Sequence, residues 1–101
     1  MEHSASLGNQ YAQYNTGLMY RDGDGLDINL EKSVYWLKQA ADQAFPDAQI
    51  DLAIALYQGS GIEQNTQEAL RLLQLAEEAG LEKAAKVREF IQAEISSQKD
   101  S

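Results

Sequence analysis

The chain has 101 residues, 44% of them apolar, and its 16 acidic and 8 basic residues give a net charge of −8. This length and apolar fraction fit one small folded domain that is rich in helix. Because Lys and Arg are sparse and no Cys is present, we expect no binding to nucleic acid or to an anionic membrane surface, and no disulfide.

The first twenty residues open with a polar stretch, residues 1–8, which we interpret as a flexible lead. From residue 9 to residue 21, apolar and small residues recur at helical spacing and predict a first helix. Gly23 and Gly25 then stop it, since glycine tolerates a positive φ and disfavours a continuing helix.

Asn29 is placed to cap a second helix with its side-chain oxygen. The inward stripe of this helix is expected to be Ser33, Val34, Trp36, Leu37, Ala40, Ala41 and Ala44.

A third helix is expected from Pro46 to about residue 58, because proline suits the first helical position. Asn65 should cap a fourth helix, with Glu68 bonding back to it in a capping box. Gly80 ends that helix as a C′ glycine, followed by the apolar Leu81. The fifth helix, residues 82–96, is interpreted as a terminal cap with a polar outer face, and residues 97–101 as a flexible tail.

The region from Asp22 to Ala44 returns in altered form 36 residues later, at Gln58 to Gly80. Such a period indicates stacked helical hairpins rather than one irregular core. We therefore divide the chain into repeat 1, residues 9–44, and repeat 2, residues 45–80, with the capping helix in the segment 81–96. The first helix of each hairpin is called the A helix, and the second the B helix.

The residues that carry this period resemble the Sel-one-like repeat (SLR) family, whose helical hairpins are related to the tetratricopeptide repeat (TPR). The matching positions are Ala12, Thr16, Gly17, Tyr20, Gly23, Gly25, Leu26, Asn29, Ser33, Trp36, Ala40 and Ala41. The resemblance covers residues 9–84 and implies an all-α fold, a right-handed α–α superhelix of the TPR/SLR-like solenoid class, with two helical hairpins and a C-terminal capping helix.

The chain departs from the family pattern at a few positions. Thr16 stands where the family prefers Leu, Asn29 and Asn65 where it prefers Asp, and Ala44 where it usually has Gly. The resemblance implies a scaffold or adaptor that binds other proteins, often in bacterial envelope, secretion or signalling contexts, and it supplies no catalytic residues.

No residue pattern predicts catalysis, a cofactor or a metal site. The one histidine, His3, lies in the polar lead with no carboxylate or nucleophile placed beside it. Asp22, Asp24 and Asp27 cluster in the first hairpin but lack the further oxygen ligands of a calcium loop. We interpret them as charges on a solvated turn.

The predicted binding surface is the concave side, which the A helices line in a solenoid of this type. One step from their core faces lies an apolar strip with polar edges, typical of a groove for a peptide or helix. Its residues are Tyr11, Tyr14, Asn15, Leu18, Arg21, Ile50, Asp51, Ile54, Tyr57, Gln58, Val87 and Phe90. Alternatively, neighbouring A helices use these side chains to pack against each other.

These observations predict a non-catalytic protein–protein interaction module that acts as an adaptor, regulator or inhibitor, whose partner is another protein or a peptide. The alternative is a structural module that self-associates through its repeat ends or groove, as a homo-oligomer. No apolar run reaches membrane-spanning length, and residues 1–20 contain no signal peptide pattern. These patterns leave the compartment open between the cytoplasm and, if a signal peptide precedes this stretch, the periplasm.

Overall fold

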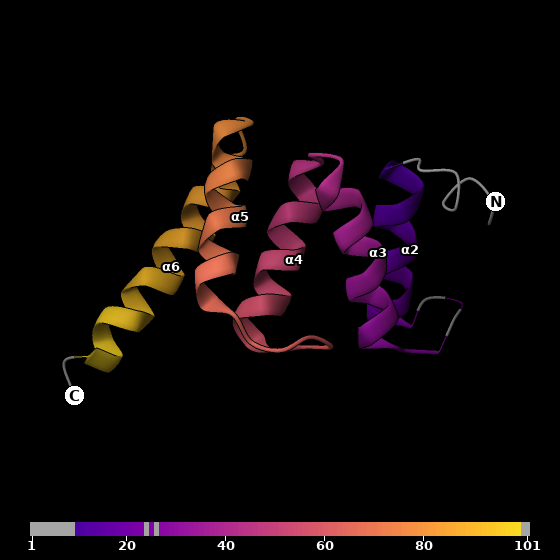
Figure 1. Cartoon of the computed structure of the whole chain (residues 1–101), viewed down its shortest axis with the longest axis horizontal. Helices are drawn as coiled ribbons and strands as arrows, with labels where there is room; N and C mark the ends of the chain where they lie inside the picture. Colours follow the sequence, from indigo (N-terminus) through magenta and orange to yellow (C-terminus); the bar gives the residue numbers. More distant parts are fainter. Residues whose placement is uncertain (1–9, 24, 26, 100–101) are drawn as a thin grey trace.

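The computed structural model describes residues 10–23, 25 and 27–99. Within these residues all regular structure is helical: α2 (Gln10–Asp22), α3 (Leu30–Asp42), α4 (Pro46–Gln58), α5 (Thr66–Glu78) and α6 (Glu82–Lys99). Consecutive helices pack side by side, so that α2 lies at one end of the row and α6 at the other (Figure 1). Each helix thus contacts mainly its neighbours in sequence, which is the arrangement of a solenoid.

The local signals for the helix starts are confirmed. The side chains of Asn29 and Asn65 accept hydrogen bonds from the backbone N–H groups of Lys32 and Glu68, both at 3.0 Å. Pro46 begins α4. The second half of the expected capping box is wrong, because the Asn65 N–H donates to the carbonyl of Leu56 at 2.9 Å. The Glu68 carboxylate instead binds Arg71.

Positive φ angles occur at all four hairpin glycines, as the recurrence of the Gly-x-Gly pattern predicts: Gly23, Gly25, Gly59 and Gly61. At Gly61 the requirement is twofold. Besides its φ of 75°, an added Cβ would overlap the Leu30 carbonyl at the start of α3. The second hairpin therefore rests directly on the first repeat.

Helices α3 and α5 end in the same way. At the end of α5, the Leu81 N–H donates to the Ala76 carbonyl, and Gly80 has a φ of 102°. At the end of α3, the Phe45 N–H donates to the Ala40 carbonyl, and Ala44 takes the left-handed position with a φ of 63°. The expected place of Ala44 on the buried stripe is wrong, because α3 ends at Asp42 and the Ala44 side chain is exposed.

The core runs along the row of helices and is built mostly from Ala and Leu side chains. Its buried apolar members are Val34, Leu37, Ala40, Ala41, Phe45, Ala48, Ile50, Leu52, Ala53, Leu56, Ala69, Leu72, Leu73, Ala76, Ala84 and Ile91. The prediction that Trp36 belongs to this core is wrong, because Trp36 is only half-buried and meets Tyr35 edge-on, with ring centroids 5.2 Å apart. Large indole rings are seldom fully covered.

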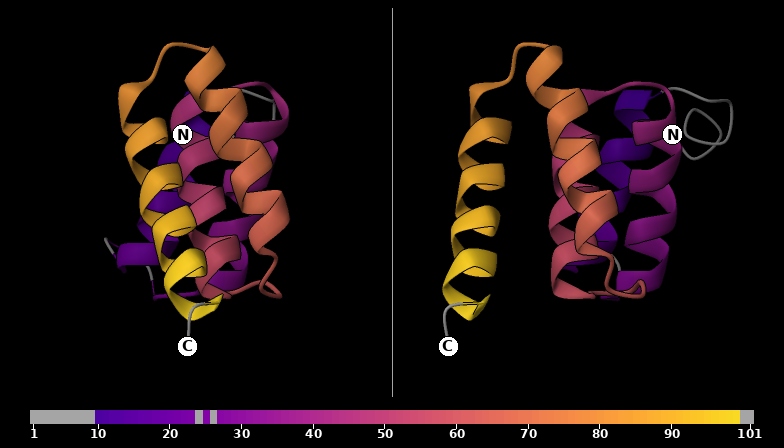
Figure 2. Two further views of the ribbon diagram at one scale, coloured as in Figure 1. Left: turned by 90° about the vertical axis from the view of Figure 1, so that its left-hand side faces the viewer. Right: turned by 60° about the vertical axis from the view of Figure 1, so that its left-hand side comes forward.

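Helix α6 carries charged residues at positions where α4 carries buried apolar residues. One repeat period after Leu52 and Ala53, α6 carries Arg88 and Glu89. Arg88 pairs with Glu77 of α5, and Glu89 is exposed, which agrees with the polar outer face expected of the last helix. Helix α6 continues through Lys99, past the expected end at residue 96 (Figure 2). None of the described helices is both long and apolar enough to cross a bilayer.

Candidate functional site

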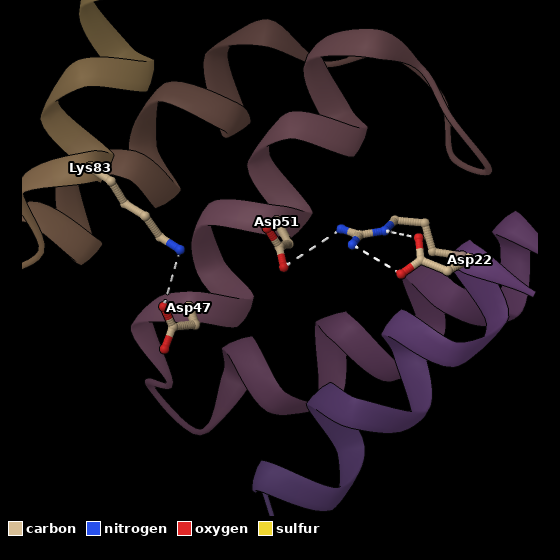
Figure 3. A network of polar contacts seen from close by, with 5 residues as sticks. Asp22, Asp47, Asp51 and Lys83 are labelled. Carbon is tan, nitrogen blue, oxygen red and sulfur yellow. Dashed lines mark hydrogen bonds and ion pairs between the residues drawn. The ribbon is translucent and has the colours of Figure 1, made fainter. Parts of the chain in front are cut away.

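The A helices α2 and α4 are joined by charged side chains. Arg21 of α2 lies between Asp22, at 3.1 Å, and Asp51 of α4, at 3.8 Å (Figure 3). Asp51 is only 15% exposed at its side chain, so its charge is balanced within the molecule. At this junction the strip side chains Arg21 and Asp51 link neighbouring A helices, as the alternative interpretation of the strip described.

Tyr14 is part of the same junction. Its ring meets that of Phe45 edge-on, with centroids 5.1 Å apart, and Tyr11 meets the same phenylalanine at 5.0 Å. Burial and a hydrogen bond to Asp51 raise the pKa of Tyr14 well above its usual range. The phenol is therefore held in its neutral form against α4.

Between α4 and α6, polar contacts join the two helices near each end. Lys83 lies 3.5 Å from Asp47 near the start of both helices (Figure 3). Further along, the Tyr57 hydroxyl donates a hydrogen bond to the Glu94 carboxylate, which raises the pKa of Tyr57. These two contacts hold α6 beside α4.

An apolar groove lies along these two helices. This α4–α6 groove has a volume of about 330 Å³ and is lined by Ile54, Tyr57, Gln58, Lys86, Val87, Phe90 and Ile91. Ile91 is buried, whereas Phe90 is 60% exposed although it is a large apolar residue. An exposed phenylalanine beside a hollow of this size is typical of a surface that another molecule covers.

A second hollow adjoins the groove on the other side of α4. It has a volume of about 120 Å³ and lies among α2, α3 and α4, beneath the Arg21–Asp51 ion pair. Ile54 and Gln58 line both hollows, so this edge of α4 separates them. Of these two neighbouring hollows, the α4–α6 groove is the larger. A further hollow of about 370 Å³ is lined by Asn15, Leu18, Met19 and Asp22, all from α2.

A wider hollow, of about 730 Å³, lies between α5 and α6 and is lined by Gln67, Leu70, Arg71, Gln74, Glu77, Glu78, Arg88 and Gln92. It is wide and polar, and its two arginines already pair with Glu68 and Glu77. Charged groups that are satisfied within the molecule provide little net attraction for a ligand. We therefore place the candidate site in the smaller, apolar groove.

The residues predicted to bind a partner fall into three groups by exposure. Tyr11, Asn15, Arg21, Gln58 and Phe90 are exposed, and Tyr14, Leu18, Asp51, Ile54, Tyr57 and Val87 are partly exposed. Ile50 is the exception, because only 2% of it is exposed. Helix α4 packs against both α3 and α5, so its buried stripe is wider than that of an end helix, and it includes Ile50.

Ile91, which was not among the predicted binding residues, also lines the groove, together with Lys86. Ile91 lies one helical turn after Val87, so the 3.6-residue period of α6 was the available signal. In the acidic first hairpin, Asp22 pairs with Arg21, and Asp24 lies outside the described residues. In the part of the chain that the structure describes, no group of three or more His, Cys, Asp or Glu residues is arranged to hold a metal ion.

Solved structures with this arrangement of helices include a Sel1 repeat protein from Oxalobacter formigenes, which is 32% identical with a TM-score of 0.81 over 87% of this chain and 36% of its own. A protective antigen of uropathogenic Escherichia coli strains that displays an SLR fold is 30% identical, with a TM-score of 0.79, over 82% of this chain and 18% of its own. The Helicobacter pylori cysteine rich protein B shares the fold at 22% identity, with a TM-score of 0.77, over 81% of this chain and 62% of its own. The chain thus spans about a third or less of the length of the first two of these proteins.

These similarities confirm the all-α, right-handed solenoid of helical hairpins. The family model for the Sel1 repeat matches residues 10–45 and 46–81, so two tandem repeats cover most of the sequence. The chain belongs to the Sel1 repeat family.

Proposed function

We propose that this protein is a non-catalytic module that binds a peptide or helix of another protein on the concave face formed by its A helices. It would serve as an adaptor, regulator or inhibitor of that partner. Sel1 repeat proteins are generally protein-interaction modules, which supports the broad class.

The observation that carries the proposal is the α4–α6 groove. Its walls combine aliphatic and aromatic side chains with the polar edges of Gln58 and Lys86. Interfaces have an apolar centre surrounded by a polar rim, and aromatic residues dominate their binding energy. Phe90 and Tyr57 meet this description, whereas Tyr14 is engaged with Phe45 and Asp51.

A photo-crosslinking amino acid at position 90 tests the location of the binding face. Tyr35 provides a matched control, because it is an aromatic residue of α3 that is 56% exposed, close to the 60% of Phe90. In an extract of the native cell, we expect a discrete protein adduct from position 90 and none from position 35. That adduct should disappear when Val87 on the groove wall is changed to Asp, while the melting temperature of the variant stays near that of the parent.

Adducts formed equally from both positions would contradict a dedicated concave face. Adducts from position 35 alone would move the binding surface to the B helices. Alanine at Tyr57 or Phe90 should weaken binding of the adduct-forming partner by about 2 kcal/mol if these residues are hot spots.

Self-association is the second candidate, and exposed apolar side chains of the first repeat favour it. Ile28 is 64% exposed, Leu30 40% and Tyr35 56%. A module with few repeats gains stability when neighbours cover its ends. Sedimentation equilibrium distinguishes the two candidates, because a monomer at all concentrations rules out self-association and leaves the groove free for a partner.

A further inference from the structure

We infer that the α4–α6 groove selects a helical segment that places one large apolar side chain against Phe90 and a carboxylate against Lys86. This inference rests on the proposed function and specifies the chemistry of the partner. It reverses the expectation from composition, since a domain with a net charge of −8 would be expected to attract basic partners.

Lys86 differs from the other cations of the concave side. Arg21 pairs with Asp22 and Asp51, and Lys83 pairs with Asp47. Lys86 lines the groove and is exposed, and it forms no ion pair with any residue in the described part of the chain.

Three of the carboxylates near the groove are already engaged. The carboxylate of Glu94 accepts the hydrogen bond of the Tyr57 hydroxyl, and Asp47 and Asp51 hold Lys83 and Arg21. Glu82 and Glu89, one turn to either side of Lys86 on α6, are exposed and make no described ion pair with it. Neither glutamate lines the groove, so Lys86 is the one charged residue among its lining side chains, and a carboxylate is its complementary group.

The spacing on α6 favours a helical ligand. Lys86 and Phe90 lie four residues apart on one helix, so their side chains lie on the same face, one turn from each other. A ligand helix that lies along α6 presents its own residues at the same spacing. An apolar side chain and an Asp or Glu three or four residues away then meet Phe90 and Lys86 together.

The groove volume sets the size of the apolar anchor. About 330 Å³ is enough for one large aliphatic or aromatic side chain together with part of its helix, and Ile54, Val87 and Ile91 line the hollow beside Phe90. Contact with an apolar wall also removes water from the nearby ammonium group, which strengthens its interaction with a carboxylate. Lys86 and Phe90 thus act together in selecting a ligand.

The test is selection of displayed helical peptides of about 16 residues, randomised on one face, against the whole chain. The library also contains the sequence of α6, residues 82–99, as a probe for a second copy of this protein. We expect enriched peptides to pair a large apolar residue with Asp or Glu one turn away. By fluorescence anisotropy, Lys86→Glu should weaken the best peptide about 10-fold, and Phe90→Ala about 30-fold.

Two controls separate local charge from net charge. Lys38→Glu makes the same change in net charge at an exposed lysine of α3, and it should leave the affinity within about twofold, since Lys38 does not line the groove. Replacing the acidic residue of the peptide by Lys should restore binding to the Lys86→Glu variant and to no other. Circular dichroism of each variant establishes that it is folded.

The outcomes distinguish this inference from the proposed function. The acidic selectivity is wrong if the binding of enriched peptides depends on Phe90 but the peptides are rich in Lys or Arg. It is also wrong if their affinity depends on Phe90 but is unchanged by Lys86→Glu. In both cases the proposed concave site would still be supported. Preferential enrichment of the α6 sequence would identify a second copy as the occupant and would also overturn the acidic selectivity. If no enriched peptide depends on Phe90, both the inference and the proposed site are wrong.

Discussion

Replacing Ala44 by Gly should stabilise the protein, although alanine normally favours the folded state over glycine. Ala44 has a φ of 63° and an exposed side chain, and its counterpart one repeat later is Gly80, with a φ of 102°. The left-handed conformation costs a residue with a Cβ about 1–2 kcal/mol. Because the side chain is exposed, its removal sacrifices little buried surface.

The opposing effect is the greater freedom of glycine in the unfolded chain, about 0.4–1 kcal/mol. The difference leaves a net stabilisation of about 0.5–1 kcal/mol for Ala44→Gly. For a domain of this size, that corresponds to a rise in melting temperature of about 2–8 °C. Urea unfolding followed by far-ultraviolet circular dichroism measures the same change as a shift of the midpoint at constant m value.

Gly80→Ala is the reciprocal control. A Cβ at Gly80 would meet no atom within 4 Å, so the substitution isolates the backbone cost from steric overlap. We expect it to destabilise the domain by about 0.5–1 kcal/mol. If Ala44→Gly instead lowers the midpoint while Gly80→Ala behaves as expected, the left-handed turn at Ala44 is not strained and the reasoning is refuted.

Two further predictions concern the hairpins and the junction of α2 with α4. Gly25→Val is expected to lower the free energy of unfolding by about 1 kcal/mol. Gly61→Val should lower it clearly more, because an added Cβ at Gly61 would overlap the Leu30 carbonyl and one at Gly25 would meet no atom within 4 Å. Equal urea midpoints for the two variants would contradict this prediction. In an ultraviolet titration, the Tyr14 phenol should ionise above the usual pKa range of tyrosine, and Asp51→Asn should lower its pKa. Because folding raises the pKa of Tyr14, the neutral phenol contributes stability that is complete below the unfolded pKa of about 10 and is lost as the pH rises further. A free energy of unfolding that stays constant from about pH 9 upward would contradict this prediction.

Features encoded by a few adjacent residues were predictable from the sequence. The caps at Asn29 and Asn65, the start of α4 at Pro46 and the positive φ of the hairpin glycines depend only on local backbone geometry. The repeat period adds the order of the helices, because each hairpin must cover the apolar face of the next.

Features that depend on neighbours distant in sequence were not predictable in the same way. Ile50 and Ile54 stand one turn apart on α4, yet only Ile50 is enclosed by the flanking helices. Asp51 was placed in the predicted binding strip, and its carboxylate pairs with Arg21 from the preceding A helix. Glu68 was expected to complete a cap, but Arg71, one turn away, competes for its carboxylate. In each case the helical period predicts the side of the helix on which a residue lies, whereas its burial and its partners depend on which other elements pack there.

The repeat period also explains why the groove lies between α4 and α6 and not between α2 and α4. Arg21 and Asp51 form the ion pair that links the first two A helices. One period of 36 residues later, the corresponding positions are Tyr57 and Val87, which both line the α4–α6 groove. The same site in the solenoid is thus closed by a charged bridge in one repeat and left apolar in the next. This difference at two corresponding positions supports the proposal that a partner binds at the α4–α6 junction and not at the α2–α4 junction.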